Sequence, residues 1–133
     1  MSQRITVVAA VVERDERILI CQRRRGDRFE FKWEFPGGKV KAGEALEEAL
    51  RRELREELNV TATIAEEIHR TRHRYAEMER ELELVFFRAT LGAEAPENRA
   101  FEQIAWAERG RLPEYDWLPA DRELVKALAG GGT

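Results

Sequence analysis

Apolar positions along the chain predict a series of strands around one central helix. A valine-rich apolar run at residues 5–12 is typical of a buried strand, and the alternating residues 17–23 predict a second strand that pairs with the first as a hairpin. Residues 45–58 and 119–129 carry apolar side chains at helical spacing. The remaining expectations are a long strand or bent arm at 60–75, a polar connection at 75–80, strands at 81–90 and 103–107, and loop or irregular segments at 26–32, 91–99 and 113–117.

The expected helix at 45–58 carries three glutamates on one edge of its apolar face. At about 100° per residue, its four leucines spread over an arc of about 120°. Glu53 and Glu57 fall within the apolar stripe, and Glu56 lies just beyond Ala49. Three carboxylates are therefore gathered at a face that should turn inward.

This arrangement needs a compensating positive charge. Two carboxylates about 4 Å apart repel by roughly 4 kcal/mol at an effective dielectric near 20, and acids in the last turn oppose the helix dipole. For any one of these glutamates, pairing with Arg52 or Arg55 on a charged helix is the simpler interpretation. For the three together we favour a divalent cation, because Mg²⁺ takes oxygen ligands and keeps waters that a phosphate can replace.

The same stretch matches a known motif. Gly38, five further residues, Glu44, seven further residues and then RELREELNV at 52–60 resemble the Nudix box of nucleoside-diphosphate-X hydrolases. One fixed position differs, because Asn59 stands where the family has glycine. That position closes the helix in a left-handed turn, which asparagine tolerates well. A match of this length is a strong signal.

The resemblance implies a magnesium site and a set of catalytic residues. The metal ligands would be Glu53, Glu56 and Glu57 with the carbonyl of Gly37, and Mn²⁺ would substitute for Mg²⁺. Arg52 would hold Glu53 in place, and one of the three glutamates or a flanking one would deprotonate the attacking water. Glu44 is expected to shape the loop before the helix.

Other residues match the substrate side of MutT-like members of the family. There Phe35 would wall the base, Lys39 would lie near phosphate, and Arg23 would hold phosphates. The full set implied for substrate binding is Arg23, Arg28, Glu34, Phe35, Pro36, Gly37, Gly38, Lys39, Arg80 and Asp121. Core packing for Phe35 and Trp33, and a solvated surface for Arg23 and Arg80, are the structural alternatives.

Asp121 has two interpretations. At the start of the helix expected at 119–129 it would serve as an N-cap. Alternatively, the run LPAD resembles the MutT-like segment whose asparagine binds oxidised guanine, and an aspartate there resembles relatives that act on cytosine nucleotides. An ionised carboxylate accepts from the cytosine amino group, whereas a carboxyl with a pKa raised by burial also donates.

One family acid is missing from its usual place. The family commonly has a further glutamate six residues before a tryptophan, and counting back from Trp106 gives Ala100. Glu97 and Glu102 flank this position and are both candidates for the extra acid. Elsewhere, Cys21 is expected in the core, and His69 and His73 lack a third ligand for zinc.

Composition narrows the class of protein. A length of 133 residues and a 43% hydrophobic share suit one globular domain, expected at 1–129 with a disordered tail at 130–133. A net charge of -3 gives no basic surface for nucleic acid polymers. The absence of a membrane-spanning run or signal peptide pattern and the single cysteine indicate a cytoplasmic protein.

The resemblance implies an α/β Nudix-type fold, an α/β/α sandwich with a central mixed sheet. The function expected from it is Mg²⁺-dependent hydrolysis of 8-oxo-dGTP to 8-oxo-dGMP and pyrophosphate, which removes mutagenic nucleotides before DNA replication. One alternative is a CTP or dCTP pyrophosphohydrolase, and another is a non-catalytic nucleotide-binding Nudix domain. The partner would be a small nucleoside triphosphate, and the protein would be a monomer or homodimer.

Overall fold

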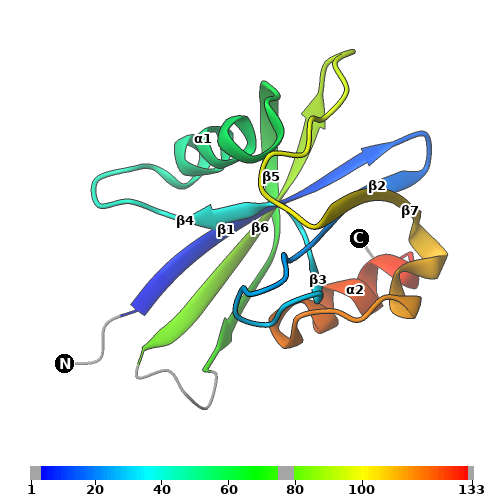
Figure 1. The fold of residues 1–133 in the computed structure, drawn as a ribbon. Helices are drawn as coiled ribbons and strands as arrows, with labels where there is room; N and C mark the ends of the chain where they lie inside the picture. The colour runs from blue at the N-terminus through cyan, green and yellow to red at the C-terminus, as the bar shows by residue number, and fades with distance from the viewer. Residues whose placement is uncertain (1–3, 75–79, 132–133) are drawn as a thin grey trace.

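A computed structural model describes residues 4–74 and 80–131 (Figure 1). The strands are β1 (Arg4–Arg14), β2 (Arg17–Gln22), β3 (Trp33–Glu34), β4 (Gly37–Lys39), β5 (Ala62–His73), β6 (Glu81–Leu91) and β7 (Gln103–Glu108). The helices are α1 (Leu46–Leu58), α2 (Arg122–Ala129) and the short 3-10 helices η1 (Arg109–Glu114) and η2 (Pro119–Asp121).

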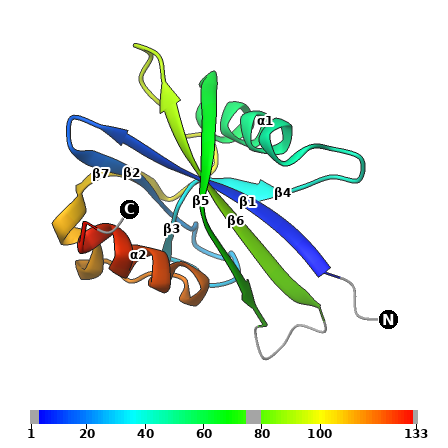
Figure 2. The same cartoon turned by 180° about the vertical axis from the view of Figure 1, so that it is seen from behind.

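The strands form one mixed sheet that lies between the two α-helices. Its order is β3-β2-β1-β6-β5, with β4 paired to β1 and β7 paired to β2. The β1 and β6 strands are parallel, whereas the β1–β2, β1–β4 and β5–β6 pairs are antiparallel. Figures 1 and 2 show α1 over one face of the sheet and α2 over the other. The α/β fold with a mixed central sheet is therefore confirmed.

The alternation of side chains along β1 supplies both hydrophobic cores. Val8, Ala10 and Val12 pack with the apolar face of α1, which contributes Ala49, Leu50, Leu54 and Leu58. Ala9 and Val11 point to the opposite face and pack with Leu124, Val125 and Leu128 of α2. Because successive side chains of a strand alternate between faces, one continuous apolar run serves both layers.

The predicted elements differ from the structure in three places. The closing helix expected at 119–129 is divided into η2 and α2, and the segment expected to be irregular at 113–117 begins inside η1. The short strands β3 and β4 were not predicted, because two or three residues give no measurable periodicity. Most of the polar connection expected at 75–80 lies outside the described residues.

The helices offer no candidate for a membrane span. Within residues 4–74 and 80–131, none is both long enough and apolar enough to cross a bilayer.

Candidate active site

Local signals at both ends fix the position of α1. At its start, the Glu48 carboxylate accepts a hydrogen bond of 3.3 Å from the Ala45 N–H, which satisfies a backbone donor of the first turn. At its end, Asn59 has φ 53° and ψ 44°, and its N–H donates to the Arg55 carbonyl. The left-handed turn predicted at Asn59 is therefore present, and it ends the helix directly after Glu57 and Leu58.

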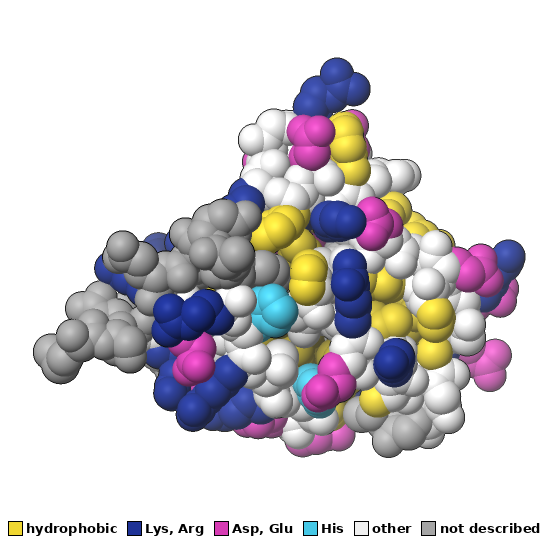
Figure 3. All heavy atoms as spheres, turned by 90° about the horizontal axis from the view of Figure 1, so that it is seen from below, with side chains coloured by type: hydrophobic (Ala, Val, Ile, Leu, Met, Phe, Trp, Pro, Cys, Tyr) yellow, Lys and Arg dark blue, Asp and Glu magenta, His cyan; other side chains and the backbone are white. Residues whose placement is uncertain are grey.

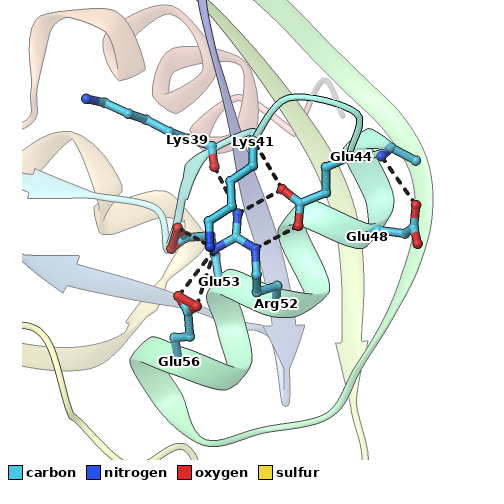
Figure 4. Close-up of polar contacts among 8 residues, drawn as sticks. Lys39, Lys41, Glu44, Glu48, Arg52, Glu53 and Glu56 are labelled. Carbon is cyan, nitrogen blue, oxygen red and sulfur yellow. Dashed lines mark hydrogen bonds and ion pairs between the residues drawn. The ribbon is translucent and has the colours of Figure 1, made fainter.

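Arg52 is the centre of a polar network on α1 (Figure 4). Its guanidinium donates to both carboxylate oxygens of Glu44 at 2.7 and 2.9 Å and to the Lys39 carbonyl at 3.1 Å. It also donates to Glu53 at 3.2 Å and to Glu56 at 3.3 Å. The predicted contact of Arg52 with Glu53 is present, and the same guanidinium joins α1 to the loop that follows β4.

Glu44 shapes this loop, as the sequence predicted. Its carboxylate accepts the Lys41 N–H at 3.0 Å as well as the two bonds from Arg52. These hydrogen bonds lower the pKa of Glu44 to about 2. Glu44 is therefore ionised at neutral pH and holds Arg52 from the side opposite Glu53.

The paired glycines let β4 pass close to α1. A Cβ on Gly38 would collide with the carboxylate of Glu53, and a Cβ on Gly37 would collide with the carbonyl of Val8. The Gly37 N–H donates to the Glu57 carboxylate at 3.2 Å. The backbone of β4 therefore contacts two of the predicted metal ligands directly, which only glycine permits here.

The carboxyl groups of Glu53 and Glu57 are crowded and half-buried. Burial, together with the charges of Glu53 and Glu34, raises the pKa of Glu57 to about 9. Burial also raises the pKa of Glu53, an effect that the hydrogen bond from Arg52 opposes. In the protein alone, repulsion and desolvation therefore disfavour two ionised carboxylates at this place.

This donor set fits a divalent cation. Two carboxylates that repel each other, beside backbone with no side chain in the way, are what a hard cation with oxygen ligands would stabilise. Glu56 lies on the same helix but is exposed and turned to Arg52. Among the residues that the structure describes, no three His, Cys, Asp or Glu side chains stand in metal-binding arrangement. The three-glutamate ligand set stays a prediction.

A cavity of about 460 Å³ adjoins these carboxylates. Nearly all of the residues predicted to bind substrate line it, namely Arg23, Arg28, Glu34, Phe35, Gly37, Gly38, Lys39 and Asp121, together with Glu53 and Glu57. Pro36 lies outside this lining and is buried, with its carbonyl bonded to the Ala10 N–H at 2.9 Å. Arg80 is exposed and is not among the described residues that line the cavity.

Apolar residues form a second part of the cavity wall. They come from β1, β6 and the segment before α2 and comprise Ile5, Val7, Val8, Ala9, Leu82, Leu84, Leu118 and Ala120. Leu82 and Leu84 alternate with glutamates along β6, a pattern that is typical of an inward face but does not distinguish a cavity from the core. In Figure 3, the face that includes the ends of these strands shows apolar side chains among Lys and Arg side chains.

Arg23 and Glu34 form a half-buried ion pair in the cavity wall. The guanidinium of Arg23 lies 3.2 Å from the Glu34 carboxylate and also donates to the Arg28 carbonyl at 2.7 Å. Burial raises the pKa of Glu34 to about 7, and the Arg23 charge partly opposes this rise. Glu34 therefore exchanges a proton near neutral pH, and Arg23 is divided between this partner and the loop.

Asp121 is buried, with only 3% of its surface exposed. Its Oδ2 has no hydrogen-bond partner within the described residues, and it makes no side-chain cap bond to α2. Burial, followed by the charge of Glu34, raises its pKa well above the ordinary value. Asp121 therefore occupies the N-cap position of α2 without making the cap bond, and its Oδ2 is an unsatisfied oxygen in the cavity wall.

Neither candidate for the extra acid lies at the cavity. Glu97 is exposed and accepts from Asn59 at 3.2 Å and Arg99 at 3.1 Å, whereas exposed Glu102 accepts the Arg25 N–H at 3.3 Å. The backbone of this loop is nevertheless tied to the end of α1, since the Arg99 N–H donates to the Glu57 carbonyl at 2.9 Å.

The other sequence candidates have structural places. Cys21 is fully buried in the core beside α1, as predicted. His69 is half-buried, with its ring against Phe86 and its Nε2 at 3.0 Å from the Glu123 carboxylate. Phe29, which the sequence did not single out, lines the cavity.

The mixed sheet between two helices and the clamped acidic helix beside a cavity define a Nudix-type α/β protein. The NUDIX domain family model matches residues 2–128, and the chain belongs to this family. It is a MutT-like Nudix hydrolase.

Three similar proteins support this placement. A Mycobacterium tuberculosis protein named "Putative 8-oxo-dGTP diphosphatase 2" is 35% identical over 92% of this chain and 86% of its own. The E. coli ORF135 protein structure is 31% identical, with a TM-score of 0.83 over 97% of this chain and 91% of that chain. The MutT structure from methicillin-resistant Staphylococcus aureus 252 is 32% identical, with a TM-score of 0.80 over 99% of this chain and 100% of that chain.

Proposed function

We propose that this protein is a Mg²⁺-dependent nucleoside triphosphate pyrophosphohydrolase whose preferred substrate is 8-oxo-dGTP. The products would be 8-oxo-dGMP and pyrophosphate, and Mn²⁺ would replace Mg²⁺. The name of the M. tuberculosis relative agrees with this substrate. The reaction would remove an oxidised nucleotide from the cytoplasmic pool before DNA replication, and the protein would act on the free nucleotide as a monomer or homodimer.

The acidic side of the cavity supports the hydrolytic step. Glu53 and Glu57, with Glu56 and the Gly37 carbonyl, would hold the cation. Bound Mg²⁺ supplies charge neutralisation for the triphosphate and lowers the pKa of a bound water. Arg52 fixes Glu53, and one of the three glutamates or a flanking one takes the proton of the attacking water. Lys39 and Arg23 line the cavity and would attract the phosphates.

The base preference rests on Asp121. Its carboxyl is buried, its Oδ2 has no partner among the described residues, and its raised pKa favours the protonated form at neutral pH. A protonated carboxyl donates through its O–H and accepts through its carbonyl oxygen. Oxidised guanine presents both kinds of group on one edge, so a substrate of this type would satisfy the Oδ2 that the folded protein leaves buried without a partner.

Cytosine nucleotides are the second candidate, because Glu34 lies near Asp121 and its pKa is about 7. An ionised carboxylate in this pair would accept from the exocyclic amine of cytosine. A preference for CTP or dCTP would therefore require that Asp121 or Glu34 binds substrate in its charged form.

Steady-state rates of pyrophosphate release would test the function and separate these substrates. The purified protein would be assayed with 8-oxo-dGTP, dGTP, CTP and dCTP, with Mg²⁺ and with a chelator. We expect kcat/KM to be highest for 8-oxo-dGTP and turnover to be lost without divalent cation. An equal kcat/KM for 8-oxo-dGTP and dGTP would reject the oxidised-guanine preference, and a higher value for dCTP would favour the cytosine alternative.

A further inference from the structure

The loop between β2 and β3 contains two phenylalanines in an unusual backbone conformation. Phe29 has φ 58° and Phe31 has φ 66°. Bulky residues rarely occupy this left-handed region, because the side chain crowds the following carbonyl. Two such residues within three positions mark a segment whose conformation the rest of the structure imposes.

Hydrogen bonds to β2 hold this loop in place. The Phe31 N–H donates to the Arg23 carbonyl at 3.0 Å, and the Phe31 carbonyl accepts from the Gln22 side chain at 3.0 Å. The Lys32 N–H donates to the Phe29 carbonyl at 3.1 Å. Strain of this kind persists where the surroundings over-determine it, and it concentrates at ligand-binding sites.

The two rings differ in what they face. Phe29 lines the cavity, whereas Phe31 is not among the described residues of its lining. An arginine lies over each ring, Arg28 at 5.1 Å from the centre of Phe29 and Arg25 at 5.8 Å from the centre of Phe31. The loop therefore contains two similar residues, of which one meets the cavity.

Contacts through its neighbour Arg28 connect Phe29 to the groups that would recognise the base. The carbonyl of its neighbour Arg28 accepts from Arg23, and Arg23 pairs with Glu34. Both Arg23 and Glu34 act electrostatically on buried Asp121. Phe29 is thus linked, through the Arg28–Arg23 and Arg23–Glu34 contacts, to the groups that would bind the base edge. Leu118 and Ala120 line the same cavity.

We propose that the Phe29 ring stacks on the nucleobase of the substrate and that Arg28 positions the ring from behind through a cation–π contact. The inference rests on the proposed function, because it takes the ligand to be a nucleotide. The left-handed backbone at Phe29 would point its ring into the cavity. Stacking would bind any planar base, so Phe29 would contribute affinity while Asp121 selects the base.

The test compares ring loss at Phe29 with the same loss at Phe31. Phe29→Leu keeps an apolar side chain of similar size and the same backbone strain but removes the ring. Phe31→Leu is the matched control. We expect Phe29→Leu to raise the KM for 8-oxo-dGTP roughly tenfold, the scale measured for loss of one base–aromatic stack, with kcat within about twofold. Phe31→Leu should leave KM within about twofold, and Phe29→Tyr should retain affinity.

A substrate without a base separates stacking from a structural effect. The kcat/KM for 2-deoxyribose 5-triphosphate should be the same in Phe29→Leu and in the unaltered protein, because this compound has no ring to stack. Phe29→Asn, whose backbone accepts the left-handed region readily, provides a second ring-free variant if the leucine variant does not fold.

The outcomes distinguish this inference from the proposed function. If the unaltered protein hydrolyses no triphosphate, the proposed function fails and the inference fails with it. If the unaltered protein is active but the ring-free Phe29 variant keeps its KM for 8-oxo-dGTP, only the stacking role is overturned. The same holds if the variant loses as much kcat/KM for the base-free substrate as for 8-oxo-dGTP. An equal rise in KM for Phe31→Leu would also overturn it.

Discussion

Glu57 combines an unfavourable place in the folded protein with a proposed role in binding the cation. Its carboxyl lies near those of Glu53 and Glu34, its pKa is about 9, and it accepts a hydrogen bond from the Gly37 N–H. Residues that serve a ligand commonly destabilise the empty protein. Glu57 should therefore show opposite effects on stability and on activity when its charge is removed.

The substitution Glu57→Gln should abolish turnover while the fold is kept. We expect kcat to fall by at least about 100-fold, the lower range for loss of a group that binds the metal or moves a proton. Without divalent cation at pH 8, the variant should unfold at the same or a higher temperature, because Glu57 must take up a proton on folding at this pH, whereas the amide is neutral in both states. Pyrophosphate release and thermal unfolding would measure both effects.

The control for this substitution is Glu47→Gln on the first turn of the same helix. Glu47 is exposed and lies outside the cavity lining, so its kcat should stay within about twofold of the unaltered protein. An active Glu57→Gln enzyme would refute the assignment of Glu57 to the site.

Single residues show why sequence reasoning succeeded in one place and failed in another. Glu53 and Glu57 could be assigned because helical spacing fixes which face of α1 they share. Asp121 could not, because an aspartate before a helix is compatible with a cap bond or with burial, and only the packing of η2 decides. Phe29 gave no signal, since the local sequence does not reveal its left-handed backbone or the bond that its carbonyl accepts from the Lys32 N–H.

At the scale of elements, the site depends on how α1 is attached to the loop after β4. Arg52 makes this attachment with one planar group that donates in several directions at once, to Glu44, to Glu53 and to the Lys39 carbonyl. Lysine carries the same charge but has no fork of fixed donors. The attachment should therefore be sensitive to geometry rather than to charge.

The substitution Arg52→Lys should weaken cation use more than folding. We expect a fall in kcat/KM of about 10- to 100-fold, typical for loss of a group that orients a metal ligand, and a higher Mg²⁺ concentration for half-maximal rate. A titration of activity with Mg²⁺ would measure both. Arg55→Lys on the same helix is the control, because Arg55 is exposed and its side chain donates to Thr61 at 3.4 Å. Unchanged Mg²⁺ dependence in Arg52→Lys would contradict the orienting role.

Elements of regular length were predictable, and short ones were not. The 13-residue α1 and the 11-residue β1 and β6 repeat their patterns over several turns or alternations, which fixes their type. The division of the last helix into η2 and α2 has no such signal, and neither has β4. The close approach of β4 to α1 was visible in the sequence only as two adjacent glycines.

At the scale of the whole molecule, the sheet separates two cores, and a half-buried and a buried carboxyl group lie at the cavity that β1, β4, β6 and η2 line. Glu34 and Asp121 are held there with raised pKa values. Glu44, whose pKa is lowered, is not among the described residues that line this cavity. The two kinds of group oppose each other in their effect on the pH dependence of stability.

Glu34 shows in which direction the free energy of unfolding changes with pH. Its pKa is 4.5 when unfolded and about 7 when folded, so the folded state binds its proton more tightly between these values. The stability that Glu34 contributes is therefore present below pH 4.5 and is lost as pH rises toward 7, by roughly 3 kcal/mol at about 1.4 kcal/mol per pKa unit. Glu57 and Asp121 act with the same sign, whereas Glu44 is already ionised above pH 4.5 and adds no slope.

We therefore expect the free energy of unfolding to decrease from pH 5 to pH 8 when it is measured by urea denaturation in the absence of divalent cation. In Glu34→Gln the decrease between pH 5 and pH 7 should be smaller, because the amide does not titrate and the pH-dependent contribution of Glu34 is removed. The substitution also removes the ion pair with Arg23. Glu47→Gln should keep the slope of the unaltered protein, since Glu47 is exposed. A stability that rises with pH over this range, or a slope that Glu34→Gln leaves unchanged, would show that the cavity does not hold Glu34 in its protonated form.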